Sequence, residues 1–190
     1  MLSLKFCNNE TIAYKLASIS LESIEIFDCS NTEIQEIPKG LINLKTLYCS
    51  NTTITEIPKE LKKLKYLTCY YTKIREIPKE LTELEELDCG NTYIETLPKE
   101  LVNLKIIYCN ISLMSHLPKE LNNIKTLHSY YTELTEIPET FTRLTELTNF
   151  YVSLYEHNER VKLYKTKLLL LISKILNYDI RSMIISKFQK

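Results

Sequence analysis

The stretch 44–63, "LKTLYCSNTTITEIPKELKK", sets the pattern of most of the chain. Apolar residues stand at its positions 1, 4, 6, 11, 14 and 18, and a proline stands at position 15. The unit that follows keeps the same apolar positions, from Leu64 to Leu81. All six prolines of the chain recur at one constant step, at positions 38, 58, 78, 98, 118 and 138, and five of its six cysteines keep the same step. A fixed period of this length is typical of a solenoid, in which each repeat stacks on the previous one.

Six units between Ile24 and Arg143 follow this template, and a seventh begins at Leu144 and then decays. A degenerate first unit fits Leu4, Cys7, Tyr14 and Leu21. The chain resembles the leucine-rich-repeat family, with its pattern LxxLxLxxNxLxxLPxxLxx, over roughly residues 4–154. It departs from that pattern in two ways. Cysteine replaces the third leucine, and a threonine or serine holds the asparagine position, at Thr32, Thr52, Thr72, Thr92, Ser112 and Thr132.

The resemblance implies an α/β fold, a right-handed solenoid or horseshoe with a parallel β-sheet on its concave face. Positions 3–7 of each unit alternate as a short strand, so positions 4 and 6 should point into the core and positions 3, 5 and 7 outward. We expect the hydroxyl at position 9 to bond the backbone of the adjacent turn. The proline should begin a convex segment that is a 3₁₀ or single α-helical turn.

Three regions follow from this division: an N-terminal cap or degenerate repeat over 1–23, leucine-rich repeats over 24–154, and a helical C-terminal cap over 155–190. Two helices are predicted in the third region, broken near 177–179. Three interpretations of them stay open: a cap over the last repeat, a docking helix for another protein, and a basic amphipathic membrane contact.

Charge and hydropathy indicate which kinds of partner and which location to expect. Residues 1–154 hold more acidic than basic residues, and 155–190 reverse the balance. Because phosphate binding needs a basic footprint, nucleic acid is not expected as the main partner. The N-terminal residues contain no unbroken apolar segment, so no signal peptide is predicted. The longest apolar run, Leu168 to Ile172, is too short to span a membrane. These observations favour a cytoplasmic protein.

The conspicuous cysteines are expected to be structural. A metal site needs ligands that converge on one point, whereas these side chains form a line with one member in each strand. Free cysteine packs as a small hydrophobe, and Ser129 at the sixth place indicates that the slot requires small size. The histidines His116, His128 and His157 fall in different units, and the chain has only two glycines. No catalytic set, cofactor site or phosphate loop is therefore predicted.

Tyrosine marks the candidate binding surface. Nine of the 13 tyrosines fall on the strand or at its exit. Exposed aromatic residues are enriched at binding hot spots, but tyrosine also favours strands, where neighbouring rings can simply cover one another. Asp28, Glu86, Asp88 and Glu146 add negative charge to the same face. The residues predicted to bind a protein partner are Tyr48, Tyr66, Tyr70, Tyr108, His128, Tyr130 and Phe150.

The function predicted from the sequence is a non-catalytic protein-interaction module, with a monomer favoured. Two alternatives stay open. One is an adaptor or substrate-recognition subunit in a ubiquitin-ligase-type or effector system, because some bacterial leucine-rich-repeat proteins carry a catalytic domain with an exposed cysteine, and no cysteine follows Cys109. The other is a purely structural repeat protein. The excess of Lys over Arg is typical of an AT-rich genome, such as that of an amoeba, a large DNA virus or a bacterium.

Overall fold

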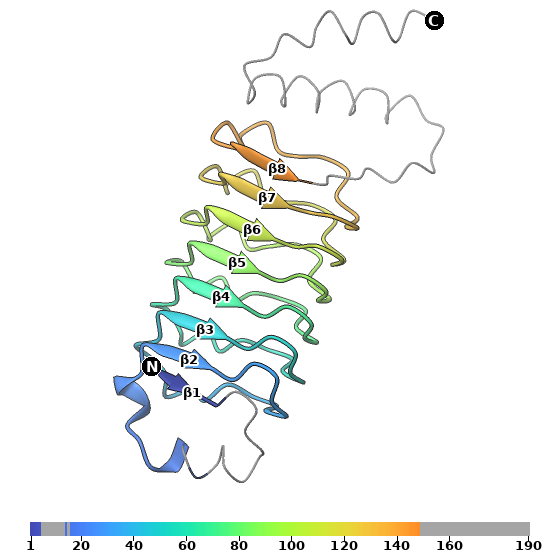
Figure 1. Ribbon diagram of the computed structural model, residues 1–190. Helices are drawn as coiled ribbons and strands as arrows, with labels where there is room; N and C mark the ends of the chain where they lie inside the picture. Colours follow the sequence, from blue (N-terminus) through green and yellow to red (C-terminus); the bar gives the residue numbers. More distant parts are fainter. Residues whose placement is uncertain (5–13, 15, 149–190) are drawn as a thin grey trace, which may run out of the picture.

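The computed structural model describes residues 1–4, 14 and 16–148. Short parallel strands follow one another in chain order and form a single eight-stranded sheet along one side of the stack (Figure 1). A 3₁₀ helix, η1 (Leu21–Ser23), precedes the second strand. The strands are β1 (Leu2–Ser3), β2 (Ile26–Asp28), β3 (Thr46–Tyr48), β4 (Tyr66–Thr68), β5 (Glu86–Asp88), β6 (Ile106–Tyr108), β7 (Thr126–His128) and β8 (Glu146–Thr148).

From β2 onward each strand pairs with the next at the repeat step, so every unit position forms a straight row across the sheet. Leu47 lies beside Leu67, for example, and Tyr48 lies beside Thr68. The first step differs, because Leu2 pairs with Phe27. Leu4 is fully buried, with its N–H donating to the carbonyl of Asp28 at 2.6 Å. The expected register of the first unit was therefore wrong, because Leu2 rather than Cys7 is the residue paired with Phe27.

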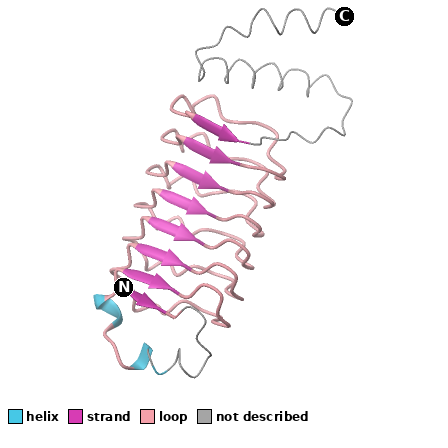
Figure 2. Cartoon of the chain, in the orientation of Figure 1, coloured by secondary structure: helices cyan, strands magenta, loops and turns pink. Residues whose placement is uncertain are grey.

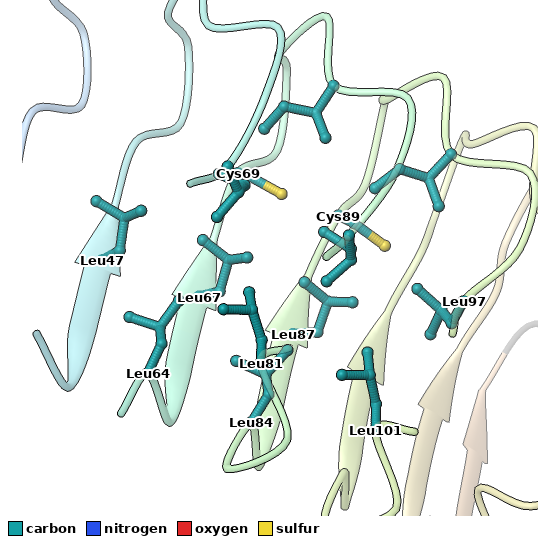
Figure 3. Packing of buried hydrophobic residues seen from close by; sticks show 14 of the residues in the cluster. Leu47, Leu64, Leu67, Cys69, Leu81, Leu84, Leu87, Cys89, Leu97 and Leu101 are labelled. Atoms are coloured by element: carbon teal, nitrogen blue, oxygen red, sulfur yellow. The ribbon is translucent and has the colours of Figure 1, made fainter. Parts of the chain in front are cut away.

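The core lies between the sheet and the turns, where the inward rows stack on one another (Figure 3). Positions 4 and 6 are fully buried in the central units, as at Leu67 and Cys69. The leucines at positions 1 and 18 close the same core from the other side. The inward half of the predicted alternation is confirmed. It follows from period-2 geometry in a strand that is covered on one face only.

The segments on the side opposite the sheet are single turns (Figure 2). In each described unit, the N–H three residues after the proline donates to the proline carbonyl, as from Leu61 to Pro58 at 3.2 Å. Proline suits the start of such a turn because its φ is fixed and it has no N–H to leave unpaired. The expected helices on this face are not confirmed, since one closed turn is too short to count as a helix.

The hydroxyl at position 9 is buried, as expected, in every described unit except that of Thr132, where it is half-buried, but its partner differs from the prediction. Thr72 Oγ1 donates to the carbonyl of Cys69, three residues earlier in the same unit, at 2.6 Å. Thr52 and Thr92 repeat this bond at 2.7 and 2.6 Å. The hydroxyl therefore fixes the turn that leaves its own strand. Neighbouring units are joined instead by backbone bonds, such as that from Cys69 N–H to the carbonyl of Asp88 at 2.8 Å.

The predicted C-terminal cap, residues 155–190, lies outside the described residues. Its helices and its three interpretations stay predictions. The division at residue 24 and the end of the repeats at 154 are not tested either.

Candidate functional site: the outer face of the sheet

The candidate site is the sheet face, defined as the side chains at positions 3, 5 and 7 of each unit, which point away from the core. Six of the seven predicted residues belong to described parts of this face. Tyr48, Tyr66 and Tyr70 are 39%, 43% and 45% exposed. Tyr108, His128 and Tyr130 are half-buried. Phe150 lies outside the described residues.

The structure divides these residues into two groups. Tyr48, Tyr66 and Tyr70 lie on or directly after β3 and β4. The second group lies on or after β6 and β7, where the rings of Tyr108 and His128 have their centroids 4.6 Å apart. Between the two groups lies β5, whose outward side chains on the strand are Glu86 and Asp88.

Carboxylate side chains lie beside the second aromatic group. Asp88 pairs in register with Tyr108, and Tyr108 pairs with His128. Glu146, on β8, lies with Oε1 3.5 Å from His128 Nε2, and its Oε2 accepts from Thr126 Oγ1 at 3.3 Å. When His128 is protonated it forms an ion pair with Glu146. We call Glu86, Asp88, Tyr108, His128 and Glu146 the acid–aromatic centre.

The pKa values of two members of this centre, Tyr108 and Asp88, are shifted by their surroundings. Burial raises the pKa of the Tyr108 phenol, and the negative charges of Glu86, Glu146 and Asp88 raise it further. Burial also raises the pKa of Asp88, although the bond that its Oδ1 accepts from Gly90 N–H at 3.1 Å opposes that shift. The Tyr108 shift therefore reflects burial and nearby negative charge, whereas the Asp88 shift reflects burial alone.

Sequence reasoning missed a second row, at position 8, just beyond the strands. Its backbone is left-handed, with φ of 58° at Tyr71, 58° at Ile111 and 54° at Tyr131. Asparagine fills this position at Asn31, Asn51 and Asn91, and asparagine tolerates that conformation. The recurring asparagine was the available signal. A β-branched residue such as Ile111 is strained there.

The three strained residues are also exposed, and two of them join the row to the sheet face. The Tyr130 and Tyr131 rings have their centroids 3.8 Å apart, and those of Tyr70 and Tyr71 are 5.7 Å apart. Ile111 is 56% exposed. The aromatic surface therefore continues past the strand ends, onto the edge of the solenoid.

The cysteine ladder offers no chemistry to a ligand. Cys29, Cys49, Cys69, Cys89 and Cys109 are all free and buried. Burial raises the pKa of Cys29 and of Cys109 to about 12, and raises that of the three thiols between them well above the usual value. Since the thiolate is the reactive form, these groups are inert.

Among the described residues, no group of three or more His, Cys, Asp or Glu side chains could hold a metal ion. A shallow groove on the turn side is lined by the "EIPKE" segments, with lysines and glutamates around Pro58, Pro78 and Pro98. In the same part of the chain, no helix is long and apolar enough to cross a membrane.

Comparisons with known proteins agree with this architecture. The family model described as Leucine Rich Repeat matches residues 43–64. A leucine-rich-repeat protein of Leptospira interrogans is 26% identical, with a TM-score of 0.62 over 77% of this chain and 41% of that one. An internalin of Listeria monocytogenes is 22% identical, with a TM-score of 0.56 over 63% of this chain and 38% of that one. A search of curated proteins found no match.

A plant peptide hormone receptor, RGFR1, solved in complex with RGF2, has a TM-score of 0.54 at 23% identity, over 65% of this chain and 23% of that one. The chain thus spans less than half the length of each of these three structures. Together, the match over residues 43–64, the constant repeat step and the parallel-strand solenoid give the chain a leucine-rich-repeat fold. This fold is a common scaffold for protein interactions.

Proposed function

We propose that the chain is a non-catalytic interaction module that holds a protein partner on its sheet face. The observation that carries the proposal is the exposure of Tyr48, Tyr66 and Tyr70 on a face whose opposite side is a fully packed core. Rings that only stabilised the sheet could lie flat and largely covered. Rings that stay this exposed offer apolar area to a partner at little cost in side-chain entropy.

The partner would contact both aromatic groups, with Tyr108, His128 and Tyr130 forming the second. Phe150 stays a predicted member of this surface. Inert ladder thiols and the absence of a metal-binding group among the described residues support a role without catalysis. A cytoplasmic location also stays a prediction. It accords with thiols that are buried and unpaired, since disulfides form mainly in oxidising compartments.

The test is the double variant Tyr70→Ala/Tyr130→Ala in affinity capture from a lysate of the source organism. Because Tyr70 is exposed and Tyr130 is half-buried, the double variant should lower Tm only slightly, since surface substitutions usually alter stability within about 0.5 kcal/mol each. Capture of the partner should fall about thirtyfold, since a hot-spot aromatic contributes about 2 kcal/mol or more.

A matched control is Tyr14→Ala/Tyr93→Ala, which removes two tyrosines that are exposed but lie off the sheet face. This control should capture the partner as the wild type does. If Tyr70→Ala/Tyr130→Ala instead lowers Tm markedly and leaves capture intact, the tyrosines only cover the sheet and the proposal is wrong.

A further inference from the structure

The sheet face carries negative charge and no basic side chain other than one histidine. Within the described units, positions 3, 5 and 7 hold Asp28, Glu86, Asp88 and Glu146 but neither lysine nor arginine. This contrasts with the chain as a whole, whose 24 basic and 24 acidic residues balance. A face with one sign of charge favours a partner of the opposite sign.

Three of the lysines that precede the strands pair with glutamates of their own row. Lys65 and Lys105 both lie beside Glu85, with Lys65 Nζ 3.7 Å from its Oε1. Lys45 lies 2.6 Å from Glu25. These pairs form a separate row, at position 2, where the chain enters each strand. Lys125 stands in the same row, and no ion pair joins it to the centre within the described residues. The lysines of this row therefore do not neutralise the negative charges of Glu86 and Asp88.

The carboxylates of Glu86 and Asp88 can both accept hydrogen bonds from a ligand. Asp88 Oδ1 accepts from Gly90 N–H, which fixes the side chain, and no partner within the described part of the chain meets its other oxygen. Glu86 lies on the same strand and has no ion pair there. Both are half-buried, so their charges are screened less than those of surface carboxylates. Glu146 is less available because Thr126 and His128 already contact it.

An aromatic ring lies beside these carboxylates. Tyr108 stands directly across from Asp88 in the sheet, with His128 against it on the far side. A cation over a tyrosine ring is attracted by the ring's negative face. Carboxylates next to an aromatic ring are the surroundings that suit a guanidinium, which stacks on rings and makes paired hydrogen bonds to carboxylates.

We propose that the acid–aromatic centre binds an arginine side chain in an extended or exposed segment of the protein partner, with the guanidinium over Tyr108 and hydrogen-bonded to Asp88 and Glu86. This inference rests on the proposed function, because it assumes that the sheet face is the interaction surface. It adds the chemistry of the partner: a basic residue at the centre, and apolar residues over the tyrosine groups on either side.

The test uses a random peptide library displayed on phage and selected on the full chain, followed by anisotropy measurements with synthetic copies of the selected peptides. Arginine should be enriched in them, and changing that arginine to glutamine should weaken binding about tenfold or more. The variant Glu86→Gln/Asp88→Asn should weaken the wild-type peptide by a similar factor. In that variant, the change from arginine to glutamine in the peptide should have little further effect.

The substitutions preserve shape, and the amide oxygen introduced by Asp88→Asn can still accept from Gly90 N–H. A matched control is Glu56→Gln/Glu76→Gln, which removes two exposed carboxylates on the turn side and should leave affinity unchanged. Raising the salt concentration should weaken the arginine peptide and not its glutamine counterpart.

Two results would overturn the inference in different ways. In the first, peptide binding is lost with Tyr70→Ala/Tyr130→Ala but depends neither on arginine nor on Glu86 and Asp88. The sheet face would then remain a binding surface, and the proposed arginine site would be wrong. Selection that yields no binder, or binders unaffected by either sheet-face variant, would end both this inference and the proposed function.

Discussion

Replacing Ser129 with cysteine should raise the free energy of unfolding, because Ser129 places a hydroxyl in a row of buried thiols. Its side chain is fully buried, and its Oγ has no hydrogen-bond partner among the described residues. At the equivalent position, Cys109 Sγ lies 3.4 Å from the carbonyl of His128 on the next strand. The longer C–S bond reaches a carbonyl that a hydroxyl oxygen does not, and a thiol costs little to bury.

The magnitude follows from the cost of an unpaired hydroxyl. A buried polar group without a partner costs about 1–3 kcal/mol. Removing it through Ser129→Cys should therefore stabilise the protein by about 1–2 kcal/mol, which corresponds to roughly 2–8 °C in Tm for a chain of this size. The reverse change, Cys69→Ser, should cost about 1–3 kcal/mol. Cys69→Ala, which adds no hydroxyl, should cost less.

The assay is urea and thermal unfolding under reducing conditions, followed by circular dichroism, with all three variants measured beside the wild type. A Ser129→Cys protein that melts lower than the wild type, or a Cys69→Ser protein as stable as Cys69→Ala, would contradict the assigned cost of a buried hydroxyl. Either outcome would mean that the ladder positions tolerate a hydroxyl, so that the recurrence of cysteine there has some other cause.

Three further predictions concern the thiols, the strained row and the buried carboxylate. In a Cys7→Ser background, the ladder thiols should resist a bulky disulfide reagent in the native state and react fully in urea, as measured by released thiolate; full native reactivity would place them outside the core. Ile111→Asn should raise the free energy of unfolding by about 1–2 kcal/mol by relieving a left-handed β-branched residue, and Asn91→Ile should lower it by a similar amount, both read from urea denaturation. Burial raises the folded-state pKa of Asp88, so its charged form destabilises the fold at neutral pH. Asp88→Asn should therefore raise Tm at pH 7, with a gain that shrinks as the pH falls and vanishes below about pH 4, the unfolded pKa; a gain independent of pH would contradict this.

The repeat could be predicted from the sequence because one period controls every unit. A constant step, with apolar positions such as Leu67 and Cys69 in fixed places, allows only one inward face. The same period gave the wrong register at the N-terminus, where Leu2 pairs with Phe27. Atypical terminal repeats are free to differ because they contact only one neighbour.

The candidate site was only partly predictable. Alternation placed Tyr70 and Tyr108 on the outward face, since side-chain direction in a strand depends on local geometry alone. The association of Asp88 with Tyr108 and of His128 with Glu146 depends on which strands are neighbours and which rotamers pack, and no single repeat contains that information. The left-handed backbone at Ile111 could not be predicted from the sequence either, because isoleucine disfavours that conformation.

Site-specific photocrosslinking in the source organism would test directly whether the sheet face is the interaction surface. A benzophenone amino acid would replace Tyr66, on the sheet face, or Val102, off that face, in two separate variants. Both side chains are 43% exposed, so the probes are equally accessible before a partner binds. If the sheet face is the interaction surface, position 66 should give a discrete crosslinked product and position 102 should give none. A product only from position 102, or equal products from both, would show that the sheet face is not the interaction surface.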